Sequence, residues 1–188
     1  VLLEKEKLLG TGATQYCSGG VRYQFSTPIN VKFSLLSFPE LEKFDIGMHR
    51  YGYLILDMKD DSMPRVKMQN GLGVKSEYLT PSDIKTRFPY INIEGIKSGS
   101  FHKLDGIAEP AKLMELYEKG AKAQGVKIEV GVRVKKLVSK SGMVVGVETD
   151  KGFIETDKVI LAAGPQSAGL GNTLGIDIPI VRRRKYIV

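Results

Sequence analysis

The sequence is poor in the residues that build covalent and metal-bound sites. It has one cysteine, Cys17, and two histidines, His49 and His102. A single cysteine excludes an internal disulfide and a cysteine-based zinc site, and it is compatible with a reducing compartment, so we expect a cytoplasmic protein. Two histidines provide neither a histidine-rich metal site nor an obvious Ser/His/Asp set, and we expect no metal.

Long apolar runs and concentrated charge are also missing. No apolar stretch reaches membrane-spanning length, and no segment has the pattern of a signal peptide. The net charge of +7 is scattered apart from one basic run at residues 182–185, and no stacking aromatics are interleaved with basic residues elsewhere. We therefore expect no nucleic-acid partner and no membrane span. The chain starts at Val1 inside an apparent strand, so we expect a piece of a longer protein.

What the chain does have is a glycine-rich segment, "KEKLLGTGATQYCSGGVRYQFS", at residues 5–26. The dinucleotide fingerprint G-x-G-x-x-G needs a strand directly before it, a helix directly after it, and a third glycine. Here Gly10 and Gly12 are followed by Gln15 where the third glycine should stand, and the apolar run at residues 1–3 ends well before Gly10. The segment is therefore not a pyrophosphate fingerprint.

Two helices are indicated in the middle of the chain. Residues 80–89 begin with Thr80 as N-cap, Pro81 at the first helical position and Asp83 in the first turn, and Pro89 ends the helix. A second helix begins at residues 109–110 and ends before a glycine at position 125. Its small and apolar residues follow the spacing of one buried face: Leu113, Leu116, Tyr117, Gly120 and Ala121.

Strand patterns follow the second helix. Residues 127–135 alternate between apolar and charged side chains, as a half-buried strand does. Turn residues at 141–142 and 150–152 connect this strand to two more, which predicts an antiparallel meander of three strands. Residues 159–163 are apolar without alternation, which indicates a strand covered on both faces in a parallel sheet. A short helix is expected after Gly164-Pro165.

Two further features bear on ligand binding. A glycine at the carboxyl end of a buried parallel strand, here Gly164, lets a ligand approach the backbone, but it suits a tight turn without a ligand equally well. Residues 1–4 form a strand that closes on Glu4. In dinucleotide folds such a carboxylate binds the adenosine ribose, roughly 20 residues after the glycine fingerprint. Taken alone, Glu4 fits a solvated surface position better.

An acid-ended strand, a glycine-rich loop, a helix–strand–meander unit and "VILAAGP" follow one another in a specific order. With this order the sequence resembles the D-amino-acid oxidase family of FAD-dependent oxidoreductases, and within it the sarcosine oxidase, dimethylglycine dehydrogenase and proline dehydrogenase type. The strongest blocks are residues 1–26, 104–128, 131–165 and 175–188. The resemblance implies a mixed α/β (α+β) fold. It would comprise a partial Rossmann-like FAD-binding domain with a three-stranded antiparallel meander, and part of a mixed-sheet substrate domain.

The resemblance also implies which residues lie along FAD. Glu4 would bind the ribose, the strand containing Val134 would give backbone hydrogen bonds to adenine, and the glycine-rich loop would wrap the cofactor. The implied cofactor-binding residues are Glu4, Gly12, Ala13, Thr14, Gly19, Gly20, Val21, Val134, Ala162, Ala163 and Gly164. Some relatives attach flavin through a histidine in this loop, but the corresponding position holds Tyr16. Cys17 is expected to be a small packed side chain.

Substrate contacts would come from the same loop and from a second lobe. Arg22 would bind a substrate carboxylate, with a surface ion pair as the equal alternative, and Tyr51 is a substrate-contact candidate that shares a strand face with Tyr53. One arginine of the 182–184 run could face an anionic substrate. The implied domains are residues 1–44 with 104–176, an incomplete FAD-binding domain, and residues 45–103 with 177–188, the substrate-domain portion.

The function implied is oxidation of the CH–N bond of an amino acid or N-methyl amino acid, with hydride transfer to FAD. The alternatives are a relative that oxidises a CH–OH substrate, either a 2-hydroxy acid or glycerol phosphate, and a noncatalytic flavin-fold subunit. The expected partner is the small amine substrate, and no acid or base residue is nominated. As given, the chain is expected to be free of FAD and to self-associate through an exposed sheet edge.

Overall fold

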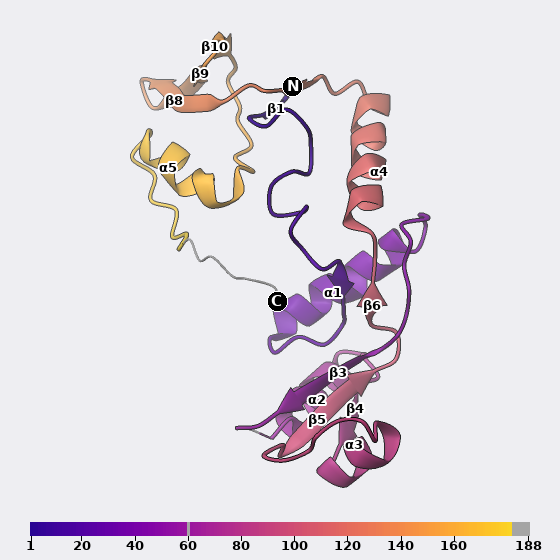
Figure 1. Ribbon diagram of the computed structural model, residues 1–188. Helices are drawn as coiled ribbons and strands as arrows, with labels where there is room; N and C mark the ends of the chain where they lie inside the picture. Colours follow the sequence, from indigo (N-terminus) through magenta and orange to yellow (C-terminus); the bar gives the residue numbers. More distant parts are fainter. Residues whose placement is uncertain (60, 182–188) are drawn as a thin grey trace. The chain divides into compact units, whose positions relative to one another are not determined.

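The computed structural model describes residues 1–59 and 61–181 (Figure 1). The chain forms two compact units: residues 1–11 together with those from 119 onward make unit 1, and residues 12–118 make unit 2. Both units mix helices and strands, which confirms the predicted mixed α/β class. The predicted domain ranges, 1–44 with 104–176 and 45–103 with 177–188, stay a prediction. No helix in the described residues is both long and apolar enough to cross a membrane.

Unit 1 opens with the predicted acid-ended strand. Strand β1 (Leu2–Glu4) pairs in parallel with β7 (Ile128–Val130), and Glu4 lies opposite Val130. Directly after β7, Gly131 has a φ of 64°. This left-handed conformation, which suits glycine, redirects the backbone. The prediction of one continuous strand over 127–135 is therefore wrong, because the segment is two strands that belong to different sheets.

The predicted meander is confirmed. Strands β8 (Val134–Lys140), β9 (Met143–Thr149) and β10 (Gly152–Glu155) form an antiparallel sheet in the order β10-β9-β8. The β8–β9 turn places Ser141 and Gly142 at φ values of 52° and 80°, as tight hairpin turns require. Helix α5 (Ser167–Asn172) lies beside β8, where the backbone N–H of Leu137 donates to Thr173 Oγ1 at 3.0 Å.

The segment at 159–163 is not the predicted buried strand. It has no regular secondary structure, and Ile160 is 95% exposed. A strand of a parallel sheet is held by hydrogen bonds to its neighbours, and the parallel sheet of the described residues contains only β1 and β7. After this segment the chain makes a 3-10 turn at Gly164–Gln166 and enters α5, the predicted short helix.

Unit 2 is built on an antiparallel sheet in the order β3-β5-β4, formed by Tyr53–Asp57, Ser98–His102 and Glu77–Leu79. One face of this sheet packs in an apolar cluster around Phe101 and Leu79 with Ile84. Every second residue of a strand points the same way, so Ser98, Ser100 and His102 share the other face of β5, which is polar. There α2 (Met63–Gly71) lies close by, and the Ser62 hydroxyl donates to Ser98 Oγ at 2.8 Å.

Two longer helices belong wholly or partly to unit 2: the first lies within it, and the second runs from unit 2 into unit 1. Helix α1 (Pro28–Leu41), which the sequence did not predict, buries Val31 and Phe38. Helix α4 (Pro110–Ala123) starts and ends as predicted, but its expected buried face is only partly covered, and Tyr117 is 63% exposed. The short strands β2 (Gly20–Val21) and β6 (Gly106–Ile107) pair with each other beside α1 (Figure 1).

Helix α3 (Pro81–Arg87) has the predicted N-cap. The backbone N–H of Asp83 donates to Thr80 Oγ1 at 3.2 Å, and the backbone N–H of Thr80 donates to Asp83 Oδ2 at 2.9 Å. These two bonds form a capping box, which satisfies two backbone donors at the start of the helix. The hydrogen bonds from Thr80 also lower the pKa of the Asp83 carboxyl below its ordinary value of 3.8.

We expect Thr80→Ala to lower the free energy of unfolding by about 1 kcal/mol, the usual cost of losing an N-cap side chain. Because Asp83 has a lowered pKa in the folded state, its share of stability is present above about pH 4 and is lost as the pH falls through the folded pKa. Urea unfolding of the parent chain and of Thr80→Ala, at neutral and at acidic pH, measures the loss of stability and its pH dependence. Thr86→Ala is the control within the same helix. Equal unfolding midpoints for Thr80→Ala and the parent chain would contradict the assignment.

Candidate functional site

The candidate site of unit 2 begins at the β2–β6 ladder. Gly20 pairs with Ile107 and Val21 with Gly106. On the other side of β6, the backbone N–H of His49 donates to the carbonyl of Ile107 at 2.8 Å, and the N–H of Ile107 donates back to His49 at 2.9 Å. Strand β6 is therefore held between β2 and the His49 backbone. This pairing fixes the course of the chain that leads into Arg22.

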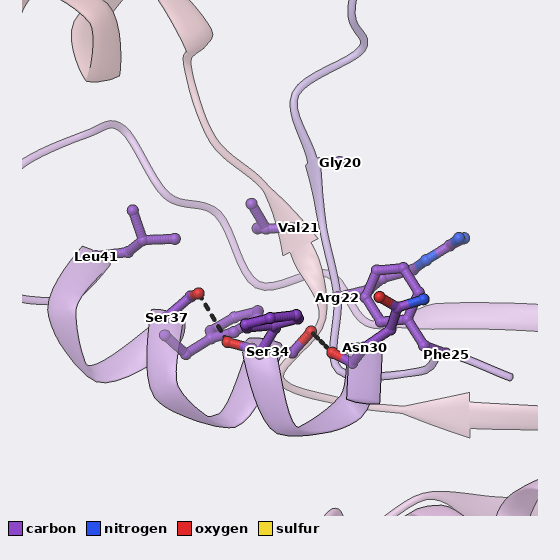
Figure 2. Close-up of a pocket in the computed structure, with 10 residues that line it drawn as sticks. Gly20, Val21, Arg22, Phe25, Asn30, Ser34, Ser37 and Leu41 are labelled. Atoms are coloured by element: carbon purple, nitrogen blue, oxygen red, sulfur yellow. Dashed lines mark hydrogen bonds between the residues drawn. The ribbon is translucent and has the colours of Figure 1, made fainter. Parts of the chain in front are cut away.

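A pocket of about 240 Å³ lies between this segment and α1. Figure 2 shows the side chains of α1 along one wall and residues 20–25 along the other. The lining residues are Gly20, Val21, Arg22, Phe25, Asn30, Phe33, Ser34, Ser37, Phe38 and Leu41. The serine hydroxyls bond to their own helix, since Ser34 Oγ donates to the Asn30 carbonyl at 3.1 Å and Ser37 Oγ to the Phe33 carbonyl at 2.7 Å.

Arg22 is the cation of this pocket. Its guanidinium carbon lies 4.9 Å from the centre of the Phe25 ring, a cation–π contact. Within residues 1–59 and 61–181, no carboxylate forms an ion pair with it, so the alternative of a surface ion pair has no partner there. The arrangement combines an open, largely apolar surface pocket with one exposed guanidinium, which can hold a carboxylate through two parallel hydrogen bonds.

Behind Arg22 lies a buried polar network around Asp105, which is fully buried. The backbone N–H of Tyr23 donates to Asp105 Oδ1 at 2.8 Å, and Gln24 Nε2 donates to Oδ2 at 3.1 Å. His102 Nδ1 lies 2.8 Å from Oδ1. Sequence reasoning missed this network, because Asp105 and its partners at 23–24 are far apart in the chain and follow no motif.

The Tyr23 ring packs between the network and α1. It stacks on Phe38 with the ring centres 3.8 Å apart and meets the edge of His102 at 5.0 Å. Burial raises the pKa of the Tyr23 hydroxyl, and the Asp105 charge raises it further against the opposing effect of Arg50. Tyr23 is therefore neutral near pH 7, and its ring acts as a packing group.

The other predicted residues of unit 2 lie outside this pocket. Gly12, Ala13 and Thr14 occupy turns ahead of β2, where Cys17 Sγ donates to the Thr14 carbonyl at 3.1 Å. Cys17 is exposed, so its expected packed position is wrong. Gly19 has a φ of 70° and precedes β2.

Tyr51 is 71% exposed, stacks on His49, and does not line the pocket. The prediction that Tyr51 and Tyr53 share a strand face is wrong, because β3 begins at Tyr53. Gly52, with a φ of 77°, turns the backbone just before the strand. The substrate contact of Tyr51 stays a prediction, and the arginines at 182–184 lie outside the described residues.

The remaining predicted residues belong to unit 1. Glu4 ends β1, and its Oε1 accepts the backbone N–H of Glu6 at 2.8 Å. Val134 is the first residue of β8, paired with Thr149. Ala162 and Ala163 lie in the irregular segment that leads to Gly164, whose φ is 53°. In the described residues, no group of His, Cys, Asp or Glu is arranged to hold a metal ion.

Comparison with known proteins decides the family. The family model "FAD dependent oxidoreductase" matches residues 1–188. The chain belongs to this family. It is 28% identical to 4-methylaminobutanoate oxidase (formaldehyde-forming) of Paenarthrobacter nicotinovorans, over 95% of the chain and 23% of that protein. It is also 28% identical to human mitochondrial sarcosine dehydrogenase, over 100% of the chain and 22% of that protein.

Among solved structures, this FAD-dependent oxidoreductase chain is similar to L-proline dehydrogenase from P. horikoshii. The TM-score is 0.79 at 28% identity, covering 92% of the chain and 48% of that structure. The chain thus spans less than a quarter of the two curated relatives and about half of the solved one.

The residues present fit the cofactor of this family at Glu4. Glu4 stands at the carboxyl end of a parallel strand, the place where dinucleotide folds bind a ribose. No atom lies within 4 Å of a Cβ built on Gly12 or Gly164, but this is equally true of glycines outside the implied cofactor site, such as Gly120.

Proposed function

We propose that the complete protein oxidises the CH–N bond of an amino acid or N-methyl amino acid. The observation that carries this proposal is Arg22, a guanidinium without a carboxylate partner in the described residues, at the wall of an apolar pocket. Such a site suits a small molecule with a carboxylate and a short apolar body. The names of the relatives support it, because the oxidase and the dehydrogenases above are all named for amino-acid or N-methyl amino-acid substrates.

The residues of the chain would divide the work as follows. Arg22 would hold the substrate carboxylate, while Phe25 supports the guanidinium plane. Val21 and the apolar side chains of α1 would contact the apolar part of the bound substrate. Glu4 would hold the ribose of FAD, Val134 the adenine, and the residues around Gly12 and Gly164 the cofactor body. When bound, FAD supplies the hydride acceptor for the substrate carbon next to nitrogen.

Anaerobic flavin reduction tests this function in the complete protein. We expect sarcosine, dimethylglycine, glycine or L-proline to bleach the flavin absorbance. Lactate and glycerol 3-phosphate, which offer CH–OH bonds, should leave it unchanged. Reduction by lactate or glycerol 3-phosphate alone would show that the protein oxidises a CH–OH bond, which is the alternative function. A flavin that stays oxidised with every compound would identify a noncatalytic subunit and would overturn the proposal.

We further propose that residues 1–188 alone do not retain FAD. A dinucleotide fold neutralises the pyrophosphate with the N-terminus of a helix that follows a glycine fingerprint. Among the described helices, none follows such a fingerprint. After mixing the chain with FAD and gel filtration, we expect no flavin absorbance in the protein peak. A stoichiometric flavin signal would show that the phosphates are bound elsewhere.

A further inference from the structure

We infer that Asp105 is a positioning residue that presents Arg22 to the pocket, an inference that rests on the proposed role of Arg22 in binding a carboxylate. Asp105 directly precedes β6 and is fully buried. Its carboxylate accepts the backbone N–H of Tyr23 and the side-chain amide of Gln24, the two residues after Arg22. It therefore fixes the backbone at the position from which the Arg22 side chain departs.

The network is specific for a carboxylate at position 105. Oδ1 lies 2.8 Å from both Tyr23 N and His102 Nδ1, and Oδ2 accepts from Gln24 Nε2. Three donors thus converge on two acceptor oxygens. An asparagine has one acceptor oxygen, and its NH₂ group would face a donor. Gln24 could not turn its amide over without losing the bond from Nε2 to the Tyr53 carbonyl at 2.9 Å.

Burying a carboxylate is costly unless it is hydrogen-bonded and its charge is balanced. The β2–β6 ladder already joins the two chain segments, so backbone pairing alone does not require an acid here. The Asp105 carboxylate adds hydrogen bonds to Tyr23 and Gln24, the residues that follow the ladder and Arg22. Tyr23 is held inward on Phe38, and Arg22, its neighbour along the chain, is exposed at the pocket wall.

The far side of the Arg22–Phe25 pair is anchored as well. Gln69 of α2, which is fully buried, donates from Nε2 to the carbonyl of Phe25 at 2.8 Å. The ring of Phe25 is the surface on which the Arg22 guanidinium rests. Asp105 and Gln69 thus hold the two ends of residues 23–25, so the backbone between Arg22 and its Phe25 ring contact is fixed before any ligand arrives. Such orientation reduces the entropy lost when a ligand binds.

The first measurement tests whether Asp105 holds the backbone of residues 20–25 in place, and it needs no substrate. In Asp105→Asn, we expect amide hydrogen exchange in residues 20–25 to accelerate about tenfold or more, because asparagine offers one acceptor oxygen to three donors and its NH₂ group would face one of them. Residues 77–87 should keep their parent rates, which also shows that unit 2 remains folded. Asp157→Asn, the same substitution at an exposed turn, serves as the control. Unchanged exchange in residues 20–25 would overturn the inference.

Gln24→Met provides a second variant in case Asp105→Asn fails to fold. It keeps the length of the side chain and removes the bonds to Asp105 and Tyr53. We expect a smaller acceleration in the same peptide, since the Tyr23 N–H keeps its bond to Asp105. If neither variant alters exchange in residues 20–25, Asp105 has no positioning role.

The second measurement uses anaerobic flavin reduction of the complete protein with sarcosine. In Asp105→Asn, we expect the half-saturating sarcosine concentration to rise about tenfold, while the limiting rate stays within about twofold. Adding Asp105→Asn to Arg22→Ala should cause no further rise, because the two residues act on one interaction. A further tenfold rise in the double variant would overturn the inference. If Arg22→Ala alone leaves sarcosine affinity unchanged, the proposed carboxylate site fails, while the exchange result still decides the position of residues 20–25.

Discussion

Gly106→Ala is expected to destabilise unit 2 strongly. A Cβ at this position would stand 1.9 Å from the carbonyl oxygen of His49 and 2.9 Å from its carbon. The neighbours are backbone atoms, already fixed by the hydrogen bonds between His49 and Ile107, so they cannot move aside without breaking the pairing of β6. We expect a loss of roughly 3 kcal/mol or more, the upper range for overpacking. Thermal unfolding followed by circular dichroism measures it.

Gly120→Ala is the matched control. Gly120 lies within α4, and the place that a Cβ would take there is open, with no neighbouring atom within 4 Å. Alanine is a better helix former than glycine, so this variant should gain about 0.5–1 kcal/mol. Opposite shifts of the melting temperature in the two variants would establish that close backbone contact, and not the loss of a glycine as such, causes the effect. Equal stability of Gly106→Ala and the parent would contradict the β2–β6–His49 arrangement.

Arg22→Ala in the complete protein should weaken the binding of a carboxylate-bearing substrate by roughly 10- to 150-fold, corresponding to about 1.5–3 kcal/mol for a hydrogen bond to a charged group. Arg22→Lys keeps the charge but loses the planar, two-pronged donor, so an intermediate loss is expected. The half-saturating sarcosine concentration for anaerobic flavin reduction gives the comparison.

Two controls separate this effect from a general loss of charge. Lys67→Ala removes one positive charge from an exposed position on α2 and should leave sarcosine affinity unchanged. Dimethylamine corresponds to sarcosine without its carboxylate, so its weaker reaction, where measurable, should not respond to Arg22→Ala. Unchanged sarcosine affinity in Arg22→Ala would contradict the assigned role. An equal loss of affinity for sarcosine and dimethylamine would show that Arg22 supports the fold of the site and does not bind the carboxylate.

The elements that were predicted correctly are those specified by neighbouring residues. Thr80, Pro81 and Asp83 define the start of α3 within four positions, and the tight turn at Ser141-Gly142 connects two strands of the meander. Helix α1 was missed because its apolar side chains do not form one stripe. Phe38 is buried, whereas Ile29 and Leu36 are exposed. The segment 159–163 was mispredicted because its composition is that of a buried strand, while strand formation depends on a neighbour elsewhere in the chain.

Some residues of the candidate site could likewise be predicted from the sequence and others could not. The loop of Gly20, Val21 and Arg22 could be proposed from the sequence, because its residues are contiguous and resemble a family pattern. Asp105 could not, because its role depends on contacts with residues 23–24 that only the folded chain brings together. The partner wall, α1, was equally invisible to sequence reasoning, since its helical pattern was not recognised.

The pairing of β1 with β7 has a consequence for the order of folding. Leu2 pairs with Ile128, so the whole of residues 12–118 lies between the two strands along the chain. Closing so long a loop is entropically costly, and contacts of this kind form slowly. During synthesis, β1 leaves the ribosome long before β7 does, so this pairing forms only after residues 12–118 have been made.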